Sequence, residues 1–357
     1  MARQPAQGGR IDVHHHLIPP AFVAAMAAHG LTEVASTPLP KWTVQQSLDV
    51  MDMNGIGCAL TSLSAPGVYF GDKAEAVAVA RASNEFAAQM KADHPGRFGA
   101  FAVLPIPFTP ESCAEAVYAL DVLKAEGVVL LGSTEGKFLG DPTFDELMAE
   151  LDRRKTVVFV HPNLHATTDQ IGLATPTFMV EFLCDTTRAA VNLVLSGAME
   201  RYPNISWILS HAGGFLPFIA WRVSLANNFP HFAEKAPQGV LSYIRRFYFD
   251  TALSPSPFAM AALKELVDPS YILFGSDFPF APAPLIGVEV KNLEELSVFD
   301  AKTKAGIDRG HALRLFPQLA TPDEAQGLVP AAAPPPKPLK AAIARQAVGL
   351  IDWLRNR

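Results

Sequence analysis

The sequence predicts a (β/α)8 barrel of the α/β class, followed by a helical extension at the C-terminus. Short runs rich in Val, Ile, Leu and Phe recur between segments with helical periodicity. Their nearly continuous apolarity is typical of strands that are buried on both faces. A doubly wound open sheet is the alternative, but no GxGxxG motif follows the first run. The eight candidate strands cover residues 9–16, 57–64, 97–105, 127–132, 156–162, 205–211, 246–251 and 271–277.

The segments between these strands carry start and stop signals for helices. Thr109-Pro110 is typical of an N-cap followed by proline at the first helical position. The sequence TFDE at 143–146 predicts a capping box, in which the threonine and glutamate side chains bond to each other's backbone. Gly30, Gly55 and Gly127 lie where helices are expected to end.

Three parts of the chain differ in composition. Residues 1–320 are expected to form the catalytic barrel, and residues 321–338 a Pro- and Ala-rich linker that is extended. Residues 339–357 are expected to form an amphipathic helix, whose apolar stripe packs either on its own barrel or on a second subunit. The stripe consists of Leu339, Ile343, Ala347, Leu350, Ile351 and Leu354.

Composition excludes several classes of protein. Of 357 residues, 49% are hydrophobic and 18% charged, so a substantial core is available. The net charge of −6 gives no support to binding of nucleic acid or anionic membranes. No apolar run approaches the ~18 residues that span a bilayer, and the N-terminal MARQPAQGGR lacks an apolar signal core. Three scattered cysteines suit a reducing compartment. We therefore expect a cytoplasmic protein.

The first predicted strand ends in three consecutive histidines, within the sequence IDVHHHLIPP. Side chains alternate between the two faces of a strand, so His14 and His16 point to one side and His15 points to the other. Two imidazoles on one face can bind the same metal ion, although an HxH pair is a weak motif alone. We expect His15 to face the barrel wall as a structural hydrogen-bonding residue.

Three further polar residues lie at the ends of later predicted strands. His161 in VFVHP ends the fifth strand, His211 in LSHAGG the sixth, and Asp277 in FGSDFP the eighth. Because the C-terminal ends of barrel strands meet at one mouth, we expect these residues to converge with His14 and His16. A structural role is the alternative for each histidine alone, but it accounts poorly for the whole set.

Such a set of imidazoles and a carboxylate suits one divalent transition-metal ion that keeps a position open for water or substrate. The nitrogen-rich donors favour Zn2+, with Mn2+ as the alternative. The ion lowers the pKa of bound water or polarises an oxygen of the substrate. His211 is expected beside it as general acid or base, because imidazole titrates near the working pH. Asp277 is expected to act as both ligand and proton carrier.

Several longer motifs occur together in a characteristic order. They include IDVHHHLIPP, ARASNEFAAQM at 80–90, HPGRFGAFAVLPIP at 94–107, SHAGGFLPF, YIRRFYFDTA at 243–252 and GSDFPF. From about residue 10 to 316 the chain therefore resembles amidohydrolase family 2, in its aminocarboxymuconate-semialdehyde decarboxylase-like branch. The resemblance implies metal ligation by His14, His16, His161 and Asp277, with His211 catalytic. It also implies non-oxidative decarboxylation of an aromatic or unsaturated carboxylic acid by a homodimer or higher homo-oligomer.

One departure from that branch concerns the substrate. Aminocarboxymuconate-semialdehyde decarboxylases carry an arginine five residues after the tryptophan of the segment that matches KWTVQQSLDVMD, where this chain has Ser47. The segment is closer in character to 6-methylsalicylate and hydroxybenzoate decarboxylases, in which metal chelation by the carboxylate and its ortho-hydroxyl can replace an arginine. Phe22, Trp42 and Phe278 are then candidates to stack on the substrate ring, with ordinary core packing as the alternative.

Arg222 lies eleven residues after His211, on the helix expected after the sixth strand. Eleven helical residues rise about 16 Å, which puts Arg222 too far from its own metal site to serve it. The resemblance implies that an arginine at this spacing reaches the substrate carboxylate of a partner subunit, a role that suits a guanidinium. A surface salt bridge on the outer helix is the alternative.

The leading functional prediction is a metal-dependent decarboxylase of a small hydroxyaryl acid. A hydrolase of an amide, lactone or related carbonyl compound on the same site is the alternative, because one fold supports both reactions. A non-catalytic metal-binding protein is a third class, but an inert structural site would be closed.

Overall fold

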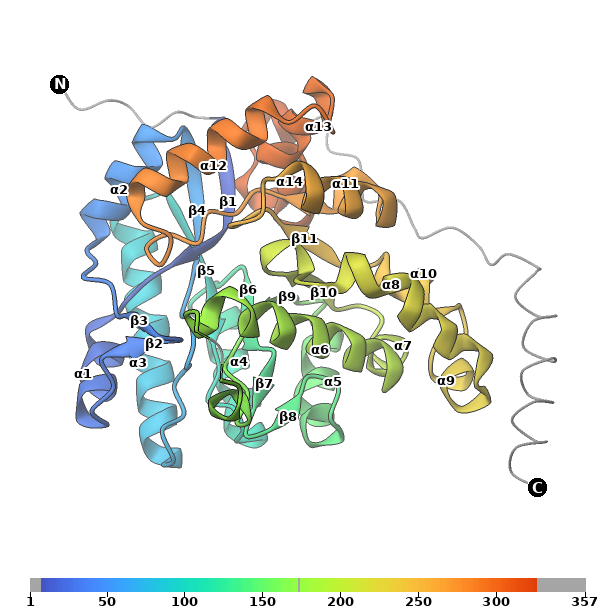
Figure 1. The fold of residues 1–357 in the computed structure, drawn as a ribbon. Coiled ribbons are helices and arrows are strands. Elements are labelled where there is room, and N and C mark those ends of the chain that lie inside the picture. Colours follow the sequence, from blue (N-terminus) through green and yellow to red (C-terminus); the bar gives the residue numbers. More distant parts are fainter. Residues whose placement is uncertain (1–7, 173, 326–357) are drawn as a thin grey trace.

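The structure, a computed structural model, describes residues 8–172 and 174–325 and contains an eight-stranded parallel barrel (Figure 1). The predicted barrel fold is thereby confirmed. Each strand pairs with its neighbour in chain order, and helices surround the strands on the outside. In barrel order the strands are β1 (Arg10–His16), β4 (Ile56–Ser62), β5 (Phe98–Val103), β6 (Gly127–Leu131), β9 (Val157–His161), β10 (Ser206–Leu209), β11 (Tyr248–Asp250) and β12 (Ile272–Leu273).

The barrel closes between β1 and the chain that follows β12. The Val13 N–H donates to the carbonyl of Phe274 (3.0 Å), and the His16 N–H donates to that of Phe278 (2.7 Å). Between them, the Asp277 N–H donates to the carbonyl of His14 (2.7 Å). These bonds place the first and last parts of the predicted metal site side by side.

The strands owe their position to apolar side chains on both faces. Val158, Phe159 and Val160 of β9 are all fully buried, as expected for a parallel strand between a barrel interior and covering helices. The covering and connecting helices are α1 (Pro20–Ala28), α2 (Val44–Met53), α3 (Lys73–Asp93), α4 (Thr109–Asp121), α5 (Asp145–Arg153), α6 (Glu181–Leu195), α7 (Ala198–Arg201), α8 (Leu216–Ser224), α9 (Pro230–Lys235), α10 (Val240–Ile244), α11 (Pro257–Leu266), α12 (Ala283–Glu295), α13 (Ala301–Ala305), α14 (Ala312–Leu315) and α15 (Pro322–Ala325).

Most predicted strands end one or more residues earlier than expected, and two of these differences affect the site. The strand predicted over 205–211 stops at Leu209, and the one predicted over 271–277 stops at Leu273. His211 and Asp277 therefore lie in turns beyond β10 and β12. Both adopt positive φ angles, +53° and +59°, which an extended strand does not allow.

The helix signals were only partly correct. Gly30 and Gly55 follow α1 and α2 with positive φ, as predicted, but Gly127 begins β6. A Cβ on Gly127 would lie 2.3 Å from the carbonyl oxygen of Val157, so close strand packing explains this glycine.

The predicted start of α4 is displaced by one residue. Thr109 is its first helical residue rather than its N-cap, and its hydroxyl donates to the carbonyl of Thr143 (2.9 Å). The capping box at 143–146 is wrong, because the Asp141 carboxylate accepts the Thr143 N–H (2.9 Å) and opens a 3₁₀ turn instead.

Two short β-hairpins lie in the connections between barrel strands. They are β2 (Glu33–Val34) with β3 (Thr37–Pro38), and β7 (Ser133–Thr134) with β8 (Lys137–Phe138). No helix among residues 8–172 and 174–325 is long and apolar enough to cross a membrane. Most of the predicted linker and the whole predicted helix at 339–357 lie outside the described residues.

Candidate active site

The predicted metal ligands meet at the C-terminal mouth of the barrel. One ligand atom from each of His14, His16, His161 and Asp277 lies within 4.8 Å of all the others, and all four residues are buried. Asp277 Oδ1 lies 3.2 Å from His14 Nε2 and 3.0 Å from His16 Nε2. β1, β9 and the turn after β12 thus bring together residues that are up to 263 positions apart in the sequence.

The hydrogen bonds around the three histidines orient their rings. In each ring Nδ1 faces a fixed acceptor, so in the neutral imidazole that binds a metal Nδ1 carries the proton. The three Nε2 atoms can then bind a cation next to Asp277 once they have lost any proton of their own, and this donor set fits a divalent transition metal. The acceptors are Asp250 Oδ2 for His14 (2.7 Å), the Ser62 carbonyl for His16 (3.1 Å) and the Pro162 carbonyl for His161 (2.8 Å).

The charges of this cluster are coupled. Burial alone would lower the pKa of His14, but the carboxylates of Asp250 and Asp277 raise it to about 10. Burial lowers the pKa of His16 and takes that of His161 well below its usual value. Burial opposes ionisation of Asp277, yet the charge of His14 and hydrogen bonds from the histidines hold its pKa well below the usual value. A proton and a metal ion compete for the lone pair of His14, so metal binding releases a proton.

Asp12 ties β1 to the turn that carries Asp277. Its carboxylate accepts the backbone N–H groups of His14 (3.0 Å) and Ser276 (3.1 Å), as well as the Ser276 hydroxyl (2.5 Å). It also accepts the Nδ1–H of His15 (3.0 Å), while the other ring nitrogen of His15 contacts the Ser47 hydroxyl (2.9 Å). The prediction that His15 is a structural hydrogen-bonding residue on the far face of β1 is confirmed.

His211 lies beside the metal ligands, in the short turn after β10. Its backbone N–H donates to Asp250 Oδ1 (2.8 Å), and its Nε2 lies 3.5 Å from Asp277 Oδ2. The turn needs the two following glycines, because a Cβ on Gly213 would meet the Phe249 ring and one on Gly214 would lie 2.4 Å from a backbone oxygen of α6. The His211 side chain is buried, and its Nδ1 has no hydrogen-bond partner among the described residues.

His161, His211 and Asp277 line a cavity of about 490 Å³, which we call the metal cavity. The remaining walls are mainly apolar. No lysine or arginine among the described residues lines it, so within one chain a bound metal ion would be the counter-charge for a carboxylate. The other lining residues are Val34, Thr37, Ser64, Phe178, Met179, Phe182, Leu183, Leu253, Ser254, Phe280 and Leu285.

The aromatic residues predicted to stack on a substrate do not line this cavity. Phe22 is 1% exposed and belongs to the hydrophobic core. The Trp42 indole N–H donates to the Ser47 hydroxyl (2.8 Å). Phe278 packs beside the His15 ring, with centroids 5.2 Å apart. These placements favour the core-packing alternative.

Three phenylalanines other than those predicted line the cavity. Phe178, Phe182 and Phe280 line the metal cavity, and the ring centroid of Phe280 lies 5.3 Å from that of His16. Sequence reasoning missed them. Phe280 follows Phe278 by two residues and could have been suspected, whereas the other two come from η3 (Thr177–Met179) and α6, where no motif marks them.

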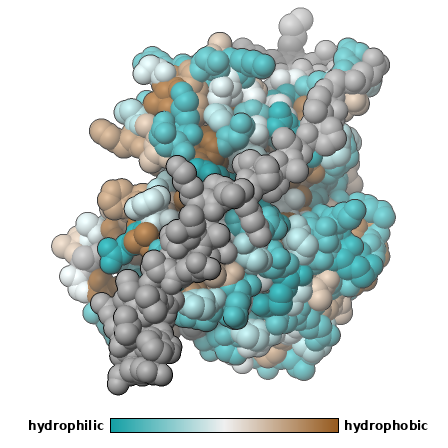
Figure 2. All heavy atoms as spheres, turned by 90° about the vertical axis from the view of Figure 1, so that its right-hand side faces the viewer, coloured by the Kyte–Doolittle hydropathy of each residue, from teal (hydrophilic) through white to brown (hydrophobic). Residues whose placement is uncertain are grey.

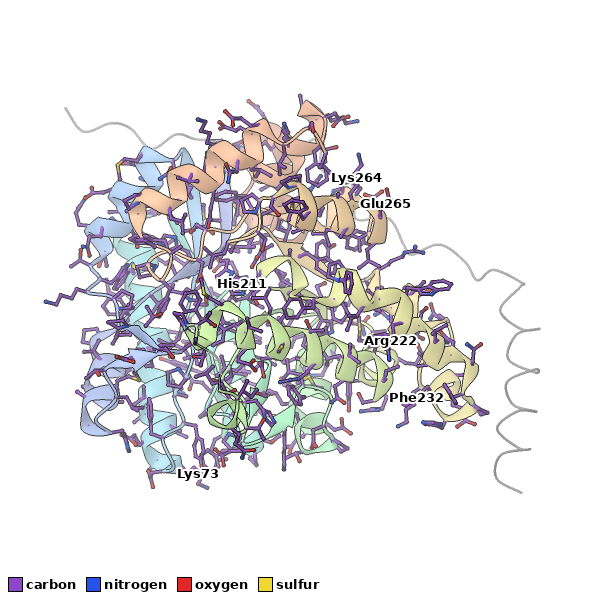
Figure 3. All side chains as sticks on the ribbon, viewed as in Figure 1. Lys73, His211, Arg222, Phe232, Lys264 and Glu265 are labelled. Carbon is purple, nitrogen blue, oxygen red and sulfur yellow. The ribbon has the colours of Figure 1, made fainter. Side chains whose placement is uncertain are left out.

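Arg222 lies on α8, on the outside of the barrel and away from His211 (Figure 3). It is exposed, and its side chain makes no hydrogen bond or ion pair within the described part of the chain. Next to it, Phe218 is 88% and Trp221 is 72% exposed. Figure 2 views the molecule from the side of α8 and α9, where hydrophobic groups lie scattered among hydrophilic ones. The alternative, a surface salt bridge of Arg222, is not formed with any of the described residues, and its role in a partner's site stays a prediction.

Comparison with known proteins agrees with this geometry. The 6-methylsalicylic acid decarboxylase of Penicillium expansum is 37% identical over 316 residues, covering 87% of this chain and 97% of the relative. A crystal structure of an amidohydrolase II is 30% identical with a TM-score of 0.82, covering 86% of this chain and 99% of that one. A dihydroxybenzoic acid decarboxylase from Polaromonas, with bound manganese and 2-nitroresorcinol, shares the fold: identity is 22% and the TM-score 0.72, with 88% and 98% covered.

The family match extends the likeness along nearly the whole described chain. Residues 11–318 match the amidohydrolase family model (Amidohydro_2), which confirms the resemblance inferred from the motifs. Because this match and the 37% identical relative both cover most of the sequence, the chain belongs to the amidohydrolase family.

Proposed function

We propose that this protein is a metal-dependent, non-oxidative decarboxylase of a small hydroxybenzoate- or salicylate-like acid. The observation that carries the proposal is the metal cavity: a buried cluster of three imidazoles and one carboxylate, with His211 beside it, under mainly apolar walls to which the described residues contribute no lysine or arginine. Curated relatives that share 26% to 37% identity with the chain are named decarboxylases, which supports the same reaction.

His14, His16, His161 and Asp277 would hold one divalent ion. The three nitrogen donors favour Zn2+, whereas the manganese in the Polaromonas structure supports Mn2+ as the alternative. When bound, the ion would offer positive charge to the carboxylate and the ortho-oxygen of the substrate. This counter-charge would take the place of an arginine at position 47, where the chain has a buried serine whose hydroxyl contacts His15 and Trp42.

The protein's own residues would then orient the ring and supply a proton. Phe182, Phe280 and Leu285 would pack against the ring and exclude water, and a dry apolar site disfavours the carboxylate relative to neutral CO2. Loss of CO2 leaves an electron pair on the ring carbon, which must accept a proton. His211 Nε2 lies 3.5 Å from Asp277 Oδ2, so these two groups form one path along which that proton can travel.

The hydrolase alternative has no support in the names of these relatives, which are all decarboxylases. It remains testable on the same protein. The experiment offers the metal-loaded chain a panel of salicylates and a panel of esters, amides and lactones. We expect CO2 from 6-methylsalicylate or a related acid and no alcohol or amine. Release of alcohol or amine without CO2 would overturn the proposal.

We further propose a homodimer in which Arg222 contributes to the partner's site. Its exposure, the lack of an ion-pair partner for it in the described part of the chain, and the neighbouring Phe218 and Trp221 support a contact surface on α8. Three free cysteines fit a reducing cytoplasm, where we place the protein.

A further inference from the structure

A second cavity, of about 390 Å³, opens at the same barrel mouth. We call it the side cavity. It lies over the ends of β4, β5 and β6, where its floor is formed by Leu63, Leu104 and Leu131 and one wall by Leu164. Leu63 and Leu104 are 3% and 4% exposed, so this floor is part of the packed barrel. Protein interiors rarely leave such apolar space unless a ligand uses it, and its volume is in the usual range for ligand sites.

The side cavity adjoins the metal cavity. Val34 of β2 lines both, so this one side chain forms a partition between them. Neighbouring residues of one segment also face different cavities: Ser64 lines the metal cavity, whereas Leu63 and Ala65 line the side cavity. A molecule bound at the metal therefore has the side cavity directly beyond Val34.

The hairpin of β2 and β3, which carries Val34, also contacts a second segment that lines the metal cavity. The Ser36 hydroxyl, at its turn, lies 3.1 Å from the Thr177 hydroxyl of η3. The next two residues of η3, Phe178 and Met179, line the metal cavity. The hairpin that carries Val34 is thus in contact with a segment whose next two residues line the metal cavity.

The chemistry of the side cavity selects its occupant. Most of its lining side chains are aliphatic, Ser133, Thr134 and Asn163 are neutral polar groups, and no lysine, arginine or histidine among the described residues lines it. The ionisable groups on its wall are the carboxylic acids of Glu33 and Glu135, together with the Tyr69 phenol. A carboxylate would be repelled there, whereas an uncharged hydrocarbon group would replace water at apolar walls.

We propose that the side cavity binds an alkyl substituent of the substrate, so that the preferred acids carry a chain longer than a methyl group. This inference rests on the proposed function, since the carboxylate and ring of the same molecule occupy the metal cavity. The specificity-determining residue is Val34, which decides whether the chain passes from one cavity to the other.

The test measures kcat/KM of the metal-loaded protein for salicylates with a methyl, propyl or pentyl group at position 6. Each methylene that leaves water contributes about 0.8 kcal/mol, so we expect kcat/KM to rise on the order of threefold to fourfold per methylene. A value that is flat or falls with chain length overturns the inference while decarboxylation of the methyl compound upholds the proposed function. If no salicylate reacts, calorimetric binding separates the two: tighter binding of the pentyl than of the methyl compound supports the side cavity alone.

Two variants localise the effect. Val34→Phe should narrow the passage, and Leu164→Phe should fill the side cavity from its loop wall. Each should lower the ratio of the pentyl to the methyl kcat/KM to about one. Val23→Phe is the matched control, because Val23 is 42% exposed on α1 and lines neither cavity, so its ratio should equal that of the unmodified protein. An unchanged ratio in both Val34→Phe and Leu164→Phe would place the chain elsewhere.

Discussion

The two sides of the barrel mouth carry different chemistry on the same repeated scaffold. On one side, β1, β9 and the turn after β12 present His16, His161 and Asp277. On the other, the ends of β5 and β6 present Leu104 and Leu131. Each strand belongs to the same type of βα unit, so the fold does not impose the difference. The difference therefore comes from the residues at the strand ends. We call the part with His16, His161 and Asp277 the reactive side, and the part with Leu104 and Leu131 the recognition side.

The largest expected effect comes from removing the reactive side. His161→Ala or Asp277→Ala should lose the bound metal and all measurable decarboxylation, because either change removes one of four donors. Metal content by elemental analysis and CO2 release check this. His165→Ala is the control, since His165 bonds to Thr167 in the same loop and lies outside the ligand cluster. Full activity in metal-free protein would contradict the assignment.

His211 should be separable from the metal. His211→Gln keeps a side chain of similar size, so we expect normal metal content and a kcat lower by a factor on the order of 10² to 10⁴, the usual contribution of a general acid or base. Steady-state kinetics and metal analysis of the same sample give both values. Loss of metal would make His211 a ligand, and a near-normal kcat would remove it from proton transfer.

Variants of Arg222 test whether one chain contains all the residues of its active site. Arg222→Ala should be nearly inactive, as should His211→Ala, but a mixture of the two should recover activity if Arg222 acts on the partner. With free exchange at equal amounts, half of the dimers are mixed and each has one intact site, giving about a quarter of full activity. Subunit exchange is confirmed by tagged chains. No recovery after proven exchange, or an active Arg222→Ala protein, would contradict this role.

A smaller effect on KM should distinguish Phe280, which lines the metal cavity, from Phe278, which does not. Phe280→Leu should raise KM about tenfold, because it reduces contact with the substrate ring at little cost to folding. Phe278→Leu should leave KM nearly unchanged and lower stability instead, because Phe278 packs on His15 behind the site. Kinetics and urea unfolding of both variants separate the two effects; equal KM values would contradict the placement of Phe280.

The smallest effect on activity is expected at Glu289 of α12. It is 5% exposed, both carboxyl oxygens lack a hydrogen-bond partner among the described residues, and burial together with Asp277 and Asp12 raises its pKa to about 9. The folded protein holds this proton where the unfolded chain has lost it, so Glu289 reduces stability as the pH rises from about 4.5 towards 9. Glu289→Gln should therefore gain stability over the unmodified protein at pH 8 but not at pH 4, as measured by urea unfolding. An equal difference at both pH values would contradict a raised pKa.

The reactive side could be predicted from the sequence because barrel topology fixes where strand ends meet. His14, His16 and His161 directly terminate apolar runs, so their convergence follows from counting strands. The orientation of the turns could not be predicted in the same way. His211 and Asp277 depend on positive φ angles, which no local pattern in the sequence specifies.

The recognition side was missed for a related reason. Once the chain leaves a strand, the alternation of side chains no longer tells which residue faces the cavity, so Phe278 was chosen over Phe280. The side cavity is formed by residues of several loops and strand ends, including Val34, and has no contiguous motif. Its aliphatic residues are indistinguishable in the sequence from ordinary core.

The most direct test of the central claim is decarboxylation of 6-methylsalicylate in D2O by the metal-loaded protein, followed by NMR and mass spectrometry. The account predicts metal-dependent release of CO2 and formation of 3-methylphenol with a single deuterium on the carbon that carried the carboxylate. His211→Gln should slow both to the same extent. Unchanged 6-methylsalicylate with every divalent metal tried, or release of CO2 that persists when the metal has been removed, would contradict it.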